Sequence, residues 1–197
     1  MKSAFFISIL LPLLAFGQEQ PQGKVESKTA VRYFDIRGRN AGELRAQLDA
    51  KGPLNEAKTK RFDARTDWRV DWSGLDFDRQ LAAKKIFRLQ KWEIKVTSTV
   101  ILPRWANEGD GTPFERRRWK VYLARLNLHE AGHVKLAERA GEALDEAFGK
   151  LGLYPSIQVL EAAVTKRAEK ILQAHIAEHA EYDRLTKHGR TQGAKYP

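Results

Sequence analysis

Two histidines and a glutamate in the middle of the chain have the residue types and the spacing of a metal site. Residues 129–133 read His-Glu-Ala-Gly-His, which is the H-E-x-x-H pattern. Four residues make about one turn of an α-helix, so His129 and His133 leave the same face of a helix and can bind one zinc ion. Glu130 is then placed to accept a proton from water. The pattern predicts a zinc-dependent hydrolase.

The surrounding sequence predicts that both histidines point into the core of the protein. From Pro113 to Leu151, apolar residues recur at the spacings of one helix face, and His129 and His133 fall on that face. A buried histidine pair can also be held by hydrogen bonds alone, without metal. The intervening Glu130 favours the metal site, and so does Gly132, because glycine lets a backbone or a substrate approach closely.

The motif supplies two ligands, whereas a catalytic zinc site has three protein ligands and an open position for water. The other histidines lie in the last quarter of the chain. They fall in or just after a second helix, which apolar periodicity predicts from about Ser156 to Lys187. Candidates for the third ligand in this region are His175, Glu178, Asp183 and His188. His175 and His179 also complete an inverted H-x-x-E-H pattern, which we interpret as coincidental.

The sequence before the motif predicts a small sheet. Strands are indicated over residues 31–36, 66–72 and 92–102, the last two by alternation of apolar and polar residues. A helix is expected over residues 41–50. Pro103 should end the third strand, because proline has no N–H to donate. We therefore expect an α+β fold in which a small, mostly antiparallel sheet packs on two long helices, as in a minimal zincin.

The N-terminus predicts export. A lysine is followed by an apolar run over residues 4–16 and by Ala-Phe-Gly at 15–17, which fits the small-x-small pattern of a signal-peptidase site. We expect a signal peptide over residues 1–17, a flexible leader over 18–30 and a single domain over 31–197. The apolar run is too short to span a membrane, and no later stretch approaches about 18 apolar residues.

Composition limits the surroundings and the partners of the mature protein. The chain has no cysteine, which excludes a thiolate zinc site and suits a protein of the bacterial periplasm or exterior that is stable without disulfides. The net charge of +10 favours contact with anionic cell-envelope components. The densest basic cluster, at residues 116–120, is interpreted as a solvated helix face. Aromatic residues do not alternate with basic ones, so nucleic acid is not an expected partner.

Several motifs together resemble a known family, the predicted secreted zinc-dependent proteases of bacteria that are filed as a domain of unknown function. The resemblance covers nearly the whole mature chain. It rests on T-x-W-x-V-x-W at 66–72, L-P-x-W at 102–105, W-x-x-Y at 119–122, the H-E-x-x-H motif and Y-D-x-x-T-x-H-G at 182–189. The last of these is the most family-specific. The resemblance implies a protease acting on proteins or peptides.

The C-terminal tail carries tyrosine, aspartate, histidine and glycine residues in a tight group that folding alone does not require. Its glycines suggest close turns near a site. We predict that His188 is the third zinc ligand and that Asp183 orients a ligating imidazole. The alternative is that Asp183 itself binds zinc, followed by Glu178 or His175.

The predicted mechanism is peptide-bond hydrolysis by a zinc-activated water. Glu130 would act as the general base and then protonate the leaving amine. Tyr182 is expected to donate a hydrogen bond to the oxyanion, and the strand over 92–102 to present its edge to an extended peptide. The alternative function is an exported zinc-binding structural or cell-envelope interaction module without catalysis, whose zinc would be enclosed by four protein ligands. The intact Glu130 favours the enzyme.

Overall fold

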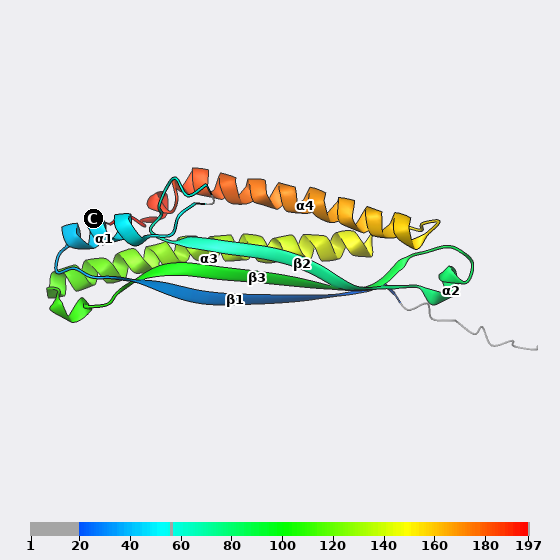
Figure 1. Ribbon diagram of the computed structural model, residues 1–197, viewed down its shortest axis with the longest axis horizontal. Helices are drawn as coiled ribbons and strands as arrows, with labels where there is room; N and C mark the ends of the chain where they lie inside the picture. Colours follow the sequence, from blue (N-terminus) through cyan, green and yellow to red (C-terminus); the bar gives the residue numbers. More distant parts are fainter. Residues whose placement is uncertain (1–19, 56, 197) are drawn as a thin grey trace, which may run out of the picture.

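Two long antiparallel helices run alongside a three-stranded sheet, and all of these elements extend along the same axis (Figure 1). The structure is a computed structural model that describes residues 20–55 and 57–196. The predicted signal peptide at 1–17 lies outside these residues. The α+β prediction is confirmed, and shorter helices accompany the two long ones. Within the described ranges, no helix is long and apolar enough to cross a membrane.

The sheet has the strand order β1-β3-β2. Its strands are β1 (Gln22–Ile36), β2 (Arg65–Phe77) and β3 (Leu89–Trp105). β2 pairs antiparallel with β3, but β1 pairs parallel with it, so the sheet is mixed rather than mostly antiparallel. All three predicted strands are present, and each is longer than the sequence indicated.

The expected flexible leader is wrong from Gln22 onward, because β1 begins there and not near residue 31. Nearly every residue of β1 is exposed, so its sequence lacks the alternation that marks a half-buried strand. The strand is held by its backbone pairing with β3, which runs unbroken from Gln22 opposite Lys91 to Ile36 opposite Trp105. The polar sequence therefore does not indicate this strand, which is held in place by its pairing with β3.

Pro103 does not end the third strand as predicted. β3 continues through it to Trp105, and Pro103 lies opposite Phe34 of β1. The antiparallel ladder with β2 ends at the pair Arg65–Ile101, so β3 has a neighbour on only one side at this point. A residue without an N–H is tolerated where one side of a strand is unpaired.

Three of the four helices among the described residues begin directly after a residue whose side chain caps them. The four are α1 (Ala41–Lys51), α2 (Arg79–Ala82), α3 (Pro113–Gly149) and α4 (Ile157–Thr186). The side chains of Asn40, Thr112 and Ser156 accept hydrogen bonds from backbone N–H groups in the first turns of α1, α3 and α4. α3 packs against α4 and against all three strands.

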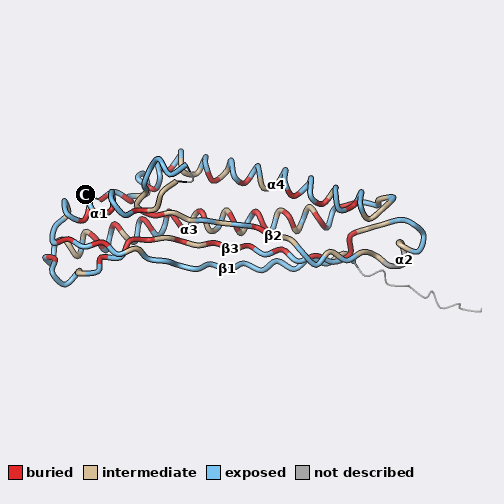
Figure 2. Tube along the Cα trace, viewed as in Figure 1, coloured by how far each residue is buried: buried red, intermediate tan, exposed pale blue. Residues whose placement is uncertain are grey.

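The interior consists of two apolar clusters. One lies between β3, α3 and α4 and contains Trp92, Leu144 and Phe148. The other joins α1, the start of α3 and the C-terminal tail, and contains Leu44, Trp119 and Tyr196. Figure 2 shows the buried residues on the facing sides of the helices and of β3. Along α3 and α4 the stretch between the clusters is buried but polar, with His129, Glu130, His133, His175 and His179.

Candidate metal centre

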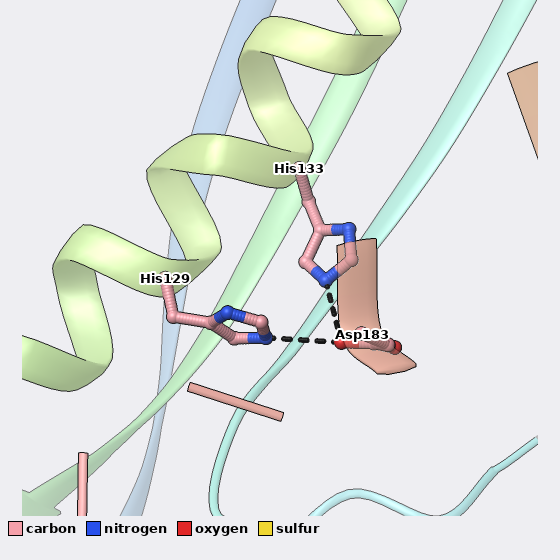
Figure 3. A group of neighbouring side chains, drawn as sticks. All are labelled: His129, His133 and Asp183. Atoms are coloured by element: carbon pink, nitrogen blue, oxygen red, sulfur yellow. Dashed lines mark hydrogen bonds and ion pairs between the residues drawn. The ribbon is translucent and has the colours of Figure 1, made fainter. Parts of the chain in front are cut away.

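His129, His133 and Asp183 bring three ligand atoms together within 4.8 Å of one another. The two histidines come from adjacent turns of α3, and the aspartate comes from the last turn of α4 (Figure 3). The Nε2 atoms of both histidines lie 3.1 Å from Oδ1 of Asp183. The predicted single-face arrangement of the histidine pair is confirmed, and the group can hold a metal ion.

Close packing of α4 on α3 sets this geometry. A Cβ atom on Gly132 would lie 2.1 Å from the hydroxyl oxygen of Tyr182, so only glycine allows this tyrosine to approach. The Tyr182 ring stacks on His129 with centroids 5.0 Å apart and meets His133 edge-on at 5.0 Å. Tyr182 precedes Asp183 in the chain, so the contact that the glycine permits also places the carboxylate.

The hydrogen-bond partner of His129 on the side away from Asp183 determines which of its two ring nitrogens carries the proton. Nδ1 lies 3.0 Å from Oε1 of Gln192, and the amide nitrogen of Gln192 donates to the Tyr182 hydroxyl at 3.0 Å. An amide oxygen only accepts, so His129 carries its proton on Nδ1 when neutral. Nε2 then presents a lone pair to the Asp183 carboxylate. Two lone pairs at 3.1 Å repel, and a cation between them removes the repulsion.

His133 has an unusual outer partner, another histidine. Its Nδ1 lies 3.0 Å from Nδ1 of His179, and the two rings are tilted by only 7°, so one imidazole donates to the other. His179 also stacks on Trp68 of β2 with centroids 4.6 Å apart. Burial lowers the pKa of His179 to about 4, and it is therefore neutral at pH 7. When His133 is the donor, its Nε2 lone pair also faces Asp183.

The electrostatics suit a cation. Burial opposes ionisation of Asp183, but whenever the two histidines carry a proton on Nε2, hydrogen bonds from His129 and His133 hold the pKa of that carboxyl well below its usual range. Burial likewise opposes protonation of His129, but the hydrogen bond to Asp183 and the charge of Glu130 raise its pKa overall. A carboxylate therefore attracts positive charge at the point where both imidazoles converge. Two neutral imidazoles and one carboxylate are a donor set that fits a zinc-type ion.

Glu130 is buried beside this group, with an exposed fraction of 3%. Its Oε2 accepts a hydrogen bond of 2.6 Å from the hydroxyl of Thr66 in β2. Burial raises the pKa of Glu130, and the Thr66 hydroxyl partly opposes this. A carboxylate with a raised pKa is a better proton acceptor, which is what a general base requires.

Of the two tail residues that the sequence offered as the third ligand, Asp183 joins the histidine pair in the group that could hold a metal ion, and His188 does not. Asp183 is the residue whose oxygen meets both histidines, whereas His188 lies outside the group, with Nδ1 3.3 Å from the same Oδ1. His188 follows the end of α4 in a left-handed conformation (φ 52°), and its side chain is 47% exposed. The turn in which Lys187, His188 and Gly189 are all left-handed places it directly after α4.

The other candidate ligands from the sequence, His175 and Glu178, lie outside the group around Asp183. Nδ1 of His175 lies 3.2 Å from Oε2 of Glu178, and Glu178 also faces Arg139 of α3 at 3.9 Å. The Tyr182 hydroxyl donates to the backbone oxygen of His129 at 3.3 Å, and this argues against the oxyanion role expected for it.

The sequence did not predict the contacts that Thr66, His179 and Gln192 make at the site. His179 lies four residues before Asp183, so a shared helix face was the available signal for it. Thr66 and Gln192 come from a strand and from the 3-10 turn Arg190–Gln192, and only the tertiary structure brings them to the site.

A cavity of about 590 Å³ opens beside the metal centre and is lined by His129, Glu130, His133, Asp183 and His188. Further lining comes from the segment before β2, from Thr66 and Trp68 within β2, and from the C-terminal tail. β2 is an edge strand of the sheet, while β3 lies between two partners. The expectation that the strand over 92–102 offers an edge to a peptide is therefore wrong, because both of its sides are paired.

Comparison with protein families identifies a match over residues 31–189 to the family described as "Bacterial protein of unknown function (DUF922)". The chain belongs to this family. The matched span contains β2, β3, both long helices and every residue of the His129, His133 and Asp183 group. Comparisons with curated proteins and with solved structures found no match.

Proposed function

We propose that this member of the DUF922 family is an exported zinc-dependent peptidase. The single observation that carries the proposal is the convergence of His129 Nε2, His133 Nε2 and an oxygen of Asp183 beside the buried Glu130. A purely structural site has no use for a buried, proton-accepting carboxylate next to its ligands. Export is proposed from the N-terminal sequence alone, which carries a lysine, an apolar run and a small-x-small site.

His129, His133 and Asp183 would hold the zinc ion. When bound, zinc supplies Lewis acidity, which lowers the pKa of water and polarises a carbonyl oxygen. Gln192 and His179 orient the two imidazoles from outside, as hydrogen-bonded partners of ligating histidines commonly do. Burial between α3 and α4 keeps bulk water from competing with these hydrogen bonds.

Glu130 performs the proton transfers in this proposal. It accepts a proton from the attacking water and returns a proton to the leaving amine. Thr66 holds Oε2 of Glu130 at 2.6 Å and leaves the other carboxylate oxygen as the acceptor. Because Thr66 belongs to β2, the sheet fixes the orientation of the base relative to α3.

An extended peptide would lie along β2. This strand has an unpaired edge in the sheet, and its residues Arg65, Thr66 and Trp68 line the cavity. Main-chain hydrogen bonds to an edge strand hold a peptide in an extended conformation, so that a peptide carbonyl group is accessible to the site. The contact between Thr66 and Glu130 then sets the distance from the bound backbone to the base.

A second function is favoured by one observation. Nδ1 of His188 lies only 3.3 Å from Oδ1 of Asp183, and a small rotation would let it complete a four-ligand site. A zinc ion enclosed by four protein ligands has no position for water and is structural. The protein would then be an exported zinc-binding module of the cell envelope.

The test uses elemental analysis and peptide cleavage on mature protein purified without chelator or a histidine tag. The peptidase proposal expects about one zinc per chain, cleavage of a denatured protein substrate by the zinc-loaded protein, and a Glu130→Gln variant that keeps zinc but does not cleave. A Glu130→Gln protein that cleaves as fast as the parent would refute the mechanism. Stoichiometric zinc without any cleavage would favour the structural module.

A further inference from the structure

We propose that the cavity beside the metal centre selects peptides that carry carboxylate side chains next to the bond to be cleaved. The inference rests on the proposed peptidase function and names its substrate class. It comes from five basic residues that surround the cavity and that we call the basic rim. They are Lys60, Arg61, Lys187, Arg190 and Lys195.

Within the described ranges, no carboxylate of the protein neutralises the basic rim. All five side chains are exposed, and among the described residues none of them forms an ion pair with a carboxylate. Lys60 lies over the ring of Phe62 at 4.9 Å, and Arg61 donates to the backbone oxygen of Gly52 at 2.7 Å. Neither contact removes positive charge, so the contacts among the described residues leave the charge of the rim available to a ligand.

The two other arginines of the lining already have acidic partners. Arg45 donates to Asp63 at 2.8 Å, and Asp63 also accepts from Tyr122 at 2.6 Å. Arg65 pairs with Asp67 at 2.7 Å. These arginines shape the wall of the cavity, and the charge available to a ligand comes from the basic rim.

The acidic residues of the lining do not cancel this charge. Apart from the paired Asp63 they are Glu130 and Asp183. Asp183 is bound by His129 and His133, and a divalent ion at the site would more than offset it. Glu130 is buried and is a single carboxylate. The cavity is therefore strongly positive, and a concave positive site concentrates anionic ligands.

The placement of the basic rim indicates a peptide rather than a flat anionic surface. Its residues come from the segment before β2, the end of α4, the 3-10 turn and the C-terminal tail, so they lie around the mouth of one cavity. A volume of about 590 Å³ accommodates a few residues of an extended chain. Carboxylate side chains on either side of the peptide residue that is bound next to Glu130 would then contact different residues of the basic rim.

The experiment measures binding to zinc-loaded Glu130→Gln protein, so that its result does not depend on cleavage. Three fluorescein-labelled peptides of the same length have glutamate, glutamine or lysine alternating with alanine. The glutamate peptide is expected to bind roughly 3- to 10-fold tighter than the glutamine peptide in low salt, because exposed charge pairs contribute modestly and several act together. The preference should vanish near 0.5 M salt, at which screening is nearly complete.

The matched variants locate the effect. Lys187→Asn with Lys195→Gln should remove most of the preference, and Lys60→Gln, in the segment before β2, should weaken it separately. Lys166→Gln with Lys170→Gln removes the same charge from the exposed face of α4 and should keep the preference. Zinc content and circular dichroism identify any variant that fails to fold.

Each outcome has one meaning. Equal binding of the three peptides, or equal losses in the rim and the α4 variants, would overturn the inference. Binding to vesicles of phosphatidylglycerol without a preference for the glutamate peptide would assign the rim to a membrane surface instead. If the glutamate preference holds but wild-type protein cleaves none of the peptides, the peptidase proposal fails while recognition of acidic peptides stands.

Discussion

Replacing His179 with phenylalanine should weaken zinc binding although His179 is not a ligand. The 3.0 Å contact between the Nδ1 atoms of His179 and His133 holds the orientation of the His133 ring, a proposed zinc ligand. Phenylalanine keeps a flat ring against Trp68, where His179 now stacks at 4.6 Å, but it removes the hydrogen bond. Loss of such outer partners lowers metal affinity about 10- to 100-fold.

This factor corresponds to about 1.4–2.7 kcal/mol of zinc binding free energy. The assay is a competition titration of the purified protein against a coloured zinc chelator, which gives Kd for parent and variant under one condition. His175→Phe is the control, because His175 is as buried as His179 on the same helix, and among the described residues no hydrogen bond or ion pair joins it to His129, His133 or Asp183.

A His179→Phe protein that binds zinc within about threefold of the parent would refute the argument that His179 orients His133, since the expected loss is at least tenfold. An equal loss in His175→Phe would also refute it, because packing on α4 and not the hydrogen bond would then be responsible. Rescue of affinity by His179→Asn, whose amide oxygen can accept from Nδ1 of His133, would support it.

Three further predictions follow from the same geometry. Asp183→Asn should lose stoichiometric zinc in elemental analysis while His188→Ala retains it, because the Asp183 oxygen meets both imidazoles and His188 lies outside; the reverse pattern would restore His188 as the ligand. Gly132→Ala should lower the free energy of unfolding by about 1–3 kcal/mol, measured by urea denaturation, because the new methyl group would meet Tyr182, and an unchanged midpoint would contradict that packing. Chelation should lower Tm, since zinc bound to the folded state stabilises it by mass action, and a Tm that ignores chelator would argue against a metal at this site.

The positions of His129, His133 and both long helices could be predicted, because local patterns in the sequence determine them. The H-E-x-x-H spacing puts two imidazoles on one helix face whatever the rest of the chain does. The caps Thr112 and Ser156 start α3 and α4 where side-chain acceptors meet free N–H groups. The apolar stripe predicts that these helix faces are buried. The structure confirms that His129 and His133 are buried.

The strands were predicted less well, because pairing is not local. β1 carries little apolar periodicity, and its order comes from the parallel ladder with β3. Pro103 signals a strand end in the sequence, but β2 ends opposite Ile101 and leaves that side of β3 open. A sequence shows which residues suit a strand, while the strand order decides which of its edges are paired.

The sequence by itself determined the chemistry available to this protein: an imidazole pair, a neighbouring carboxylate, a cysteine-free ligand set and a tail rich in polar groups. Only the tertiary structure decided which tail residue meets the pair, since the choice between Asp183 and His188 depends on the end of α4 and on the left-handed turn after it. It also brought Thr66, His179 and Gln192 to the site. These contacts join segments far apart in the chain. The distance from Thr66 to Glu130 depends on how β2 packs against α3, and those from His179 and Gln192 depend on how α4 and the tail pack against α3, where Gly132 allows the close approach of Tyr182.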